Sequence, residues 1–169
     1  MHAWYIISVI VHILAAMTWI GGMLFLVLVL VPTLRTLPSR ETAVELVASS
    51  GRRFRTIGWI SLTILVLTGY TNLHFRGVTW SAMWQETFWA TPFGDVLFYK
   101  LMLVGAILTI SVLHDFWIGP RASQALREGP GSPDAIRQRL LASWMGRLNL
   151  LLSLCVLVLG VMLVRGRPW

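Results

Sequence analysis

Long apolar segments alternate with shorter segments that carry nearly all of the charge. The first 34 residues contain no Lys, Arg, Asp or Glu, and residues 56–75 form a second uncharged run between two arginines. Because about 20 apolar helical residues cross the hydrocarbon core of a membrane, each run is long enough for a membrane span. We therefore predict an all-α integral membrane protein, a single domain over residues 1–169 built as an antiparallel four-helix bundle, with spans at about 4–31, 56–75, 92–118 and 143–164.

Local signals mark where several helices begin. Thr91 followed by Pro92 is typical of a first helical turn, and Ser132 followed by a proline is another such signal. Ser39 precedes a mixed polar and apolar run that ends at Ser50. These signals predict short amphipathic helices in the first and third connections. The second connection carries three tryptophans, which favours a position along the lipid headgroups over an aromatic substrate or partner site: Trp80, Trp84 and Trp89.

Composition and charge support a membrane location. Charged residues make up 12% of the chain, whereas soluble domains carry about 25%. The net charge of +7 comes mainly from arginines that bracket the apolar runs, so we expect contacts with the lipid bilayer and no nucleic-acid partner. By the positive-inside rule, the basic first and third connections are cytoplasmic, and both termini lie outside a bacterial-type inner membrane. The single cysteine, Cys155, excludes an internal disulfide and a multi-cysteine metal site.

Two ionisable residues are predicted within the apolar layer. His12 lies eight residues after Trp4, and Lys100 lies eight residues after Pro92. Only 14 residues separate Lys100 from Asp115, a rise of about 21 Å against a core of about 30 Å, so at least one of the two enters this layer. The spacing predicts that His12 and Lys100 lie at similar depth in the outer half. An intramembrane histidine or lysine indicates a functional site, although a lysine also reaches headgroups by snorkelling.

Other polar and aromatic residues share faces with these two. His12, Trp19 and Met23 lie on one face of the first span, beside Gly21 and Gly22. Small residues allow a neighbouring helix or a flat cofactor to approach closely, so this face is interpreted as a cofactor contact or as core packing.

Two further groups lie near the predicted ends of the spans. Tyr70 and His74 share a face near the outer end of the second span, where His74 covers the outer site or sits among headgroups. Near the inner end, His114 and Asp115 are expected beside Arg147, as a polar cluster that anchors helix ends or as a functional site.

The segment His12-x6-Trp19-x-Gly21-Gly22 resembles the first span of the copper-resistance-D-like membrane family, which includes the HemJ-type protoporphyrinogen oxidases. Residues 54–56 through 68–70 resemble the second span of that family, and residues 99–101 with the apolar run to His114 resemble the third. The resemblance implies a four-span fold and, for the HemJ-type members, a haem b cofactor. It also implies that the functional pair is His12 and Lys100.

The first functional hypothesis is a haem b-binding membrane redox protein. His12 is an axial ligand, and Lys100 or His74 is the second; Trp19 and Tyr70 lie beside the cofactor. Electrons come from a quinol or a porphyrinogen, which makes the protein a membrane oxidoreductase.

The second hypothesis is a copper-handling transporter, because imidazole and thioether groups suit copper. His2, His74 and Met83 bind the ion outside, His12 with Met17 and Met23 passes it inward, and His114 receives it. The third hypothesis is a noncatalytic subunit of a membrane complex, in contact with a partner membrane subunit or in a homo-oligomer.

Overall fold

The computed structural model describes residues 2–129 and 131–166, apart from the side chains of His2, Arg40 and Arg127. The side chain of His2, a candidate copper ligand, therefore lies outside the described part. Within that part the chain is helical with short connections and contains no strand. Four helical segments are long and apolar enough to span a membrane, which confirms the predicted all-α membrane bundle: Ala3–Arg35, Glu41–Phe75, Pro92–Leu126 and Pro133–Arg165.

The first and third segments each contain a wide π-helical turn. In the first, α1 (His2–Phe25) continues through η1 (Leu26–Leu30) into α2 (Val31–Arg35). In the third, α5 (Pro92–Leu113) continues through η3 (His114–Ile118) into α6 (Gly119–Glu128). Each wide turn ends two residues before a proline, Pro32 or Pro120. Because proline lacks the N–H group of the ordinary helical ladder and its ring crowds the preceding turn, a local widening relieves the conflict.

The second and fourth segments are single uninterrupted helices, α3 (Arg40–Phe75) and α7 (Pro133–Arg165). The Ser39 hydroxyl accepts a hydrogen bond from the Thr42 N–H, and the Ser132 hydroxyl accepts one from the Ala135 N–H, as expected of N-caps. The helices predicted after both serines form, and each runs straight into the following span. Short separate elements occur in the connection between α3 and α5, namely η2 (Ala82–Trp84) and α4 (Glu86–Trp89).

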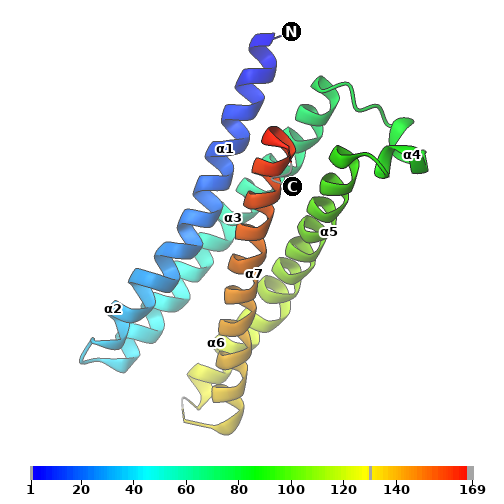
Figure 1. Cartoon of the computed structure of the whole chain (residues 1–169). Helices are drawn as coiled ribbons and strands as arrows, with labels where there is room; N and C mark the ends of the chain where they lie inside the picture. The colour runs from blue at the N-terminus through cyan, green and yellow to red at the C-terminus, as the bar shows by residue number, and fades with distance from the viewer. Residues whose placement is uncertain (1, 130, 167–169) are drawn as a thin grey trace.

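The chain passes up and down, so neighbouring segments are antiparallel (Figure 1). Helix α1 packs along α3, α5 packs along α7, and the two pairs meet through α1 and α7. Helices α3 and α5 share an apolar groove of about 200 Å³, lined by Trp59, Leu62, Thr63, Val66, Leu67 and Leu108. One end of the bundle holds the start of α1, the end of α3 and the short helix α4, and we call it the terminal end. We call the opposite end the far end.

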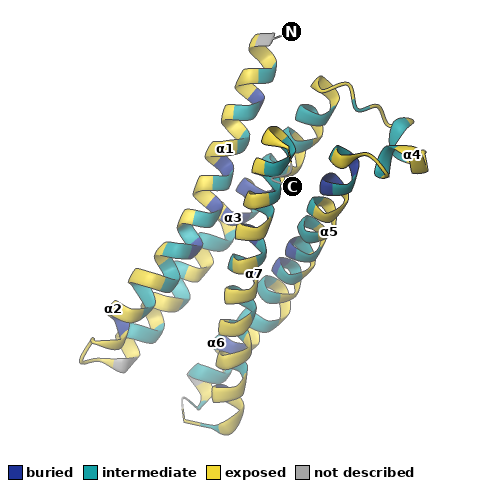
Figure 2. Ribbon diagram, viewed as in Figure 1, coloured by how far each residue is buried: buried dark blue, intermediate teal, exposed yellow. Residues whose placement is uncertain are grey.

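Most large apolar side chains are exposed on the outside of the bundle. Figure 2 shows exposed residues in yellow along all of the long helices. An apolar exterior is what a lipid environment requires, because the bilayer replaces water around the helices. The buried core is small and lies near the middle of the bundle: Trp19, Met23, Leu62 and Ile107.

Aromatic rings fill the space beside the glycines at the contact between α1 and α3. The rings of Trp19 and Phe54 stack at 5.6 Å between centroids. A Cβ atom added at Gly58 would lie 2.5 Å from Trp19 Cζ3, and one added at Gly22 would collide with the Phe54 ring. Gly22 therefore admits an aromatic side chain of α3, while a Cβ atom at Gly21 would meet open space. The sequence predicted that a neighbouring helix or a flat cofactor approaches closely at Gly21 and Gly22. In the structure the group that lies against Gly22 is the Phe54 side chain of α3.

Candidate functional site

The site is built around His12, which faces α3 from near the middle of α1. Its Nδ1 atom lies 2.7 Å from the hydroxyl oxygen of Thr68. That hydroxyl donates its single proton to the carbonyl of Ile64, 2.6 Å away. The Thr68 oxygen is therefore the acceptor for His12, and Nδ1 carries the proton. A neutral imidazole in this tautomer presents a lone pair at Nε2, as a metal ligand or a base requires.

Lys100 approaches the same region from α5. A Cβ atom added at Gly160 of α7 would lie 3.5 Å from Lys100 Nζ, so the ammonium group rests over a glycine of the adjoining helix. Lys100 is half-buried and lies within electrostatic reach of His12. Within the described part of the chain, no hydrogen bond or ion pair occupies its amino group. The two residues that the spacing placed at similar depth thus lie in the same part of the bundle, on α1 and α5.

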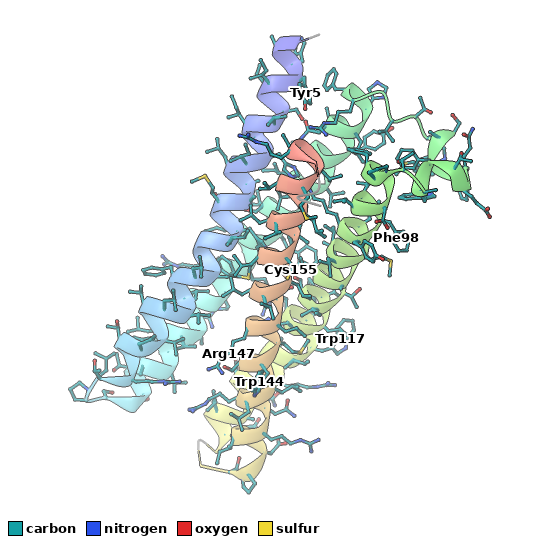
Figure 3. The ribbon with its side chains drawn as sticks, in the orientation of Figure 1. Tyr5, Phe98, Trp117, Trp144, Arg147 and Cys155 are labelled. Atoms are coloured by element: carbon teal, nitrogen blue, oxygen red, sulfur yellow. The ribbon has the colours of Figure 1, made fainter. Side chains whose placement is uncertain are left out.

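Polar side chains continue from His12 toward the terminal end. Ser8 lies four residues before His12 on α1, and Asn72 lies four residues after Thr68 on the antiparallel α3. One more turn along α3, Arg76 donates from Nε to the Tyr5 hydroxyl at 3.3 Å and from Nη1 to the Leu163 carbonyl at 3.1 Å. Tyr5 is labelled at this end of α1 in Figure 3.

The sequence analysis missed Ser8, Thr68, Asn72 and Arg76. Their spacing of four residues within apolar spans was the available signal, because residues four apart share a helix face. Serine and threonine are weak signals of a functional site, because each is common on lipid-facing helices, where its hydroxyl bonds to its own backbone. Thr71 does so here by donating to the Leu67 carbonyl at 2.8 Å.

The buried core closes the site on the far side. Trp19 and Met23 belong to that core, and the Trp19 indole N–H donates to the Ser153 hydroxyl of α7 at 3.3 Å. Trp19 thus ties the two helix pairs together below His12. Met23 packs in the core, where it forms part of the barrier between the two halves of the bundle.

Several predicted site residues lie elsewhere. Tyr70 and Met17 are each 65% exposed on the outer surface, and His74 is also exposed. Met83 is half-buried in the short turn η2 of the connection before α5. None of these is brought against His12 by a contact within the described part of the chain. Over the same residues, no group of three or more His, Cys, Asp or Glu side chains is arranged to hold a metal ion.

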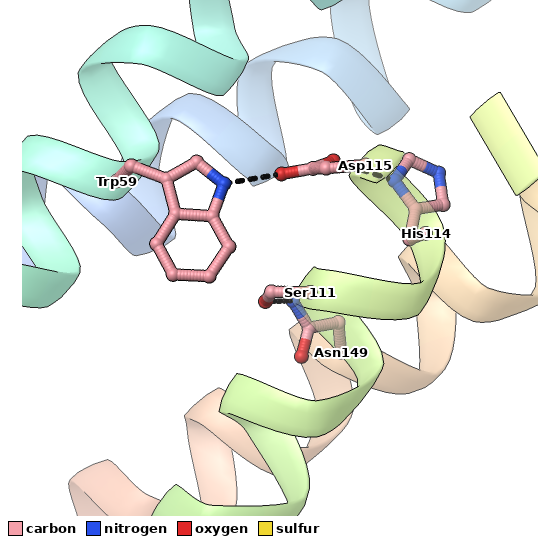
Figure 4. A network of polar contacts seen from close by, with 5 residues as sticks. All are labelled: Trp59, Ser111, His114, Asp115 and Asn149. Carbon is pink, nitrogen blue, oxygen red and sulfur yellow. Dashed lines mark hydrogen bonds and ion pairs between the residues drawn. The ribbon is translucent and has the colours of Figure 1, made fainter. Parts of the chain in front are cut away.

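A second polar network lies nearer the far end (Figure 4). Asp115 accepts a hydrogen bond from the Trp59 indole N–H at 3.0 Å and pairs with His114 Nδ1 at 2.9 Å. One turn away, the Asn149 side-chain amide donates to the Ser111 hydroxyl at 3.0 Å. The first set of bonds therefore joins α3 to η3, and the second joins α7 to α5. The network includes Trp59, which the sequence analysis did not name.

Arg147, which was expected in this network, lies instead over the Trp144 ring at 5.7 Å from its centroid. Both side chains are labelled on α7 in Figure 3. Helix α7 already begins at Pro133, so Arg147 lies within the helix and has Trp144 one turn before it. The cation–π contact with Trp144 takes the place of the expected contact with Asp115.

Comparison with known proteins places the chain among membrane proteins of one family. Residues 48–163 match the copper resistance protein D family. The chain belongs to this family. The match includes Thr68, Asn72, Lys100 and Gly160, whereas His12 precedes it.

An uncharacterized protein of Aquifex aeolicus (strain VF5) is 33% identical to the chain over 157 residues, which is 92% of each protein. No solved structure matches the chain. The resemblance to the copper-resistance-D-like family is thereby confirmed.

Proposed function

We propose that this member of the copper resistance protein D family is a membrane redox protein that holds a haem b, with His12 as one axial ligand and Lys100 as the second. The observation that supports this most is the hydrogen bond between His12 Nδ1 and the Thr68 hydroxyl, which orients the imidazole so that Nε2 is the nitrogen that would bind a metal. A bound haem supplies one-electron transfer at a potential that depends on its axial ligands and its burial.

The residues present fit such a group. A Cβ atom added at Gly69 would lie 3.6 Å from His12 Cε1, and one at Gly160 would lie 3.5 Å from Lys100 Nζ. Each donor therefore lies against a glycine of the adjoining helix, which allows the two helices to approach closely at the donors. Imidazole and amine nitrogens are donors that haem iron accepts. The exposed position of His74 favours Lys100 over His74 as the second ligand.

The other residues act on these donors and their surroundings. Thr68 holds the imidazole plane, and the core around Trp19 excludes water from the far side. A quinol or a porphyrinogen is the proposed electron donor, in keeping with the resemblance to HemJ-type proteins. Each is hydrophobic enough to arrive through the lipid layer.

The absorption spectrum of the purified protein tests this proposal. A Soret band with reducible α and β bands is expected, and His12→Ala should remove it. Lys100→Met should retain bound haem and shift the bands, because a thioether replaces the amine. His74→Ala is the matched control and should leave the spectrum unchanged. A folded, colourless protein from cells supplied with haem precursors contradicts the proposal.

Copper handling is the second candidate, favoured by the family to which the chain belongs. The predicted ligands of a copper path do not line one route, since Met17 is on the outer surface and Met23 is in the core. Elemental analysis separates the candidates: a colourless protein that retains copper, and loses it in His12→Ala, supports copper handling. A colourless, metal-free protein supports a noncatalytic subunit of a larger membrane complex.

We also propose that the terminal end faces outside and the far end faces the cytoplasm of a bacterial-type inner membrane. Both basic connections lie at the far end of the bundle (Figure 1). Labelling of single cysteines introduced at Ser81 and at Gly131 with an impermeant reagent tests this orientation. Modification at Gly131, but not at Ser81, in intact cells contradicts it.

A further inference from the structure

Two buried polar atoms beside His12 have no hydrogen-bond partner among the described residues. They are the hydroxyl oxygen of Ser8 and the side-chain oxygen of Asn72. Ser8 is only 9% exposed. Each residue lies one turn, about 6 Å, from the hydrogen-bonded pair His12–Thr68 in the direction of the terminal end. The two orphaned atoms are thus on the two helices that hold the site.

Buried polar atoms in a membrane protein are normally satisfied, because a polar group removed from water without a hydrogen-bond partner is costly. Water molecules satisfy such atoms where several polar groups converge. The polar side chains here also continue to the membrane surface, since Arg76 and Tyr5 lie one turn farther out and bond to each other. The arrangement is a polar strip that leads from the terminal end to His12.

The strip carries positive charge. Arg76 carries a guanidinium cation, and its Nη2 group has no hydrogen-bond partner within the described part of the chain. Lys100 lies within electrostatic reach of both Arg76 and His12. Among the described residues, no carboxylate forms an ion pair with Arg76 or Lys100. Because charges act over longer distances in a low-dielectric bundle, the strip repels cations and attracts anions.

We infer that Ser8, Asn72 and Arg76 line a hydrated vestibule that opens at the terminal end, leads to His12 and Lys100, and admits neutral and anionic solutes while it excludes free cations. The solute class is a small anion or the carboxylate of a larger substrate. The inference deepens the proposed function, on which it rests for the role of His12. It also means that a free copper ion does not reach His12 by this route.

Cysteine modification tests the vestibule without any cofactor. Ser8→Cys is made in a Cys155→Ala background and reacted with an anionic and with a cationic methanethiosulfonate reagent. Each rate is divided by the rate of the same reagent with a free thiol. Ile7→Cys is the matched control, because Ile7 is adjacent in sequence and 49% exposed on the lipid-facing surface.

We expect Ser8→Cys to react at least about tenfold faster than Ile7→Cys, because a thiolate forms in water and not in lipid. The anionic reagent should react about tenfold faster than the cationic one, and Arg76→Gln should bring this ratio close to one. Equal rates for Ser8→Cys and Ile7→Cys overturn the hydrated vestibule. A preference for the cationic reagent overturns its selectivity.

The absorption spectrum of the same variants is recorded in parallel. A haem band together with an unreactive Ser8→Cys contradicts the vestibule alone, whereas a reactive Ser8→Cys in a colourless protein contradicts the haem proposal alone. Asn72→Cys provides a second position in case Ser8→Cys fails to fold.

Discussion

The Nδ1 atom of His12 donates to the Thr68 hydroxyl at 2.7 Å, across the contact between two antiparallel helices. This bond orients the imidazole of a histidine that lies within a membrane-spanning helix. The acceptor in turn donates to the Ile64 carbonyl, so the orientation of the imidazole depends on the backbone of α3. Hydrogen-bonded partners of this kind orient metal-ligating histidines and raise their basicity.

Thr68→Val should leave the Nδ1 proton of His12 without an acceptor. We expect a loss of about 1–3 kcal/mol in the free energy of unfolding, and a decrease of about 10- to 100-fold in haem affinity. Haem titration and unfolding in detergent measure the two effects. Thr71→Val is the control, because the Thr71 hydroxyl bonds only to its own helix within the described residues. An equal effect in both variants would show that the bond has no special role.

Gly22→Ala should destabilise the protein, whereas Gly21→Ala should not. The added methyl group at Gly22 collides with the Phe54 ring, and the same group at Gly21 meets open space. Overpacking of this kind costs about 1–3 kcal/mol, while replacement of an exposed helical glycine by alanine gains up to about 1 kcal/mol. Thermal unfolding of the two variants in the same detergent provides the comparison. Similar melting temperatures would refute the close contact between α1 and α3.

Trp59→Phe should weaken the link between α3 and the wide turn η3. The substitution keeps an aromatic ring, although a smaller one, and Asp115 loses the indole N–H that donates to it. We expect a loss of about 1–3 kcal/mol, since the acceptor is a charged group. Trp144→Phe serves as the control, because Trp144 is 65% exposed. Unfolding monitored by circular dichroism reports both, and a larger loss in the control would contradict this role of Trp59.

Gly160→Leu should displace the amino group of Lys100. A Cβ atom at this position already lies 3.5 Å from Nζ, so a longer side chain occupies the space where the amine rests. If Lys100 ligates haem, the bands of Gly160→Leu should shift in the same direction as those of Lys100→Met. Gly146→Leu is the matched change on α7, because a Cβ atom at Gly146 has no neighbour within 4 Å. A normal spectrum in Gly160→Leu argues against Lys100 as the second ligand.

The helices and the two central residues of the site were predictable from the sequence. Apolar runs of sufficient length determine the spans, and the short run between Lys100 and Asp115 forces polar side chains into the apolar layer. The caps at Ser39, Thr91 and Ser132 also follow from local sequence, because a side chain at a helix start bonds to an N–H two or three residues ahead.

The partners of those residues were not predictable. Tyr70 and His74 do share a face, as their spacing indicated, but that face points outward. Periodicity gives the residues on each side of a helix, whereas the rotation of one helix against another depends on which surfaces pack best. Here the rings of Phe54 and Trp19 lie beside Gly22 and Gly58, and this packing sets the rotation of α3 against α1.

The contacts around the wide turn η3, at the far end of the bundle, were also not predictable from helical periodicity. A π-helical turn adds a residue to one turn and rotates everything beyond it, so a face traced along α5 no longer continues in register. Asp115, at the start of that turn, accepts from Trp59 of α3, a contact that no spacing along α5 indicates.

The sequence by itself determined that this protein spans a membrane four times, because insertion into lipid depends on the length and polarity of each segment, and it predicted His12 and Lys100 as residues of the apolar layer. The tertiary structure decided that His12 bonds to Thr68, that Lys100 rests over Gly160, and that Asp115 meets Trp59 rather than Arg147. These contacts depend on how helices distant in the chain rotate and pack against one another, which the polarity of a single helix does not specify.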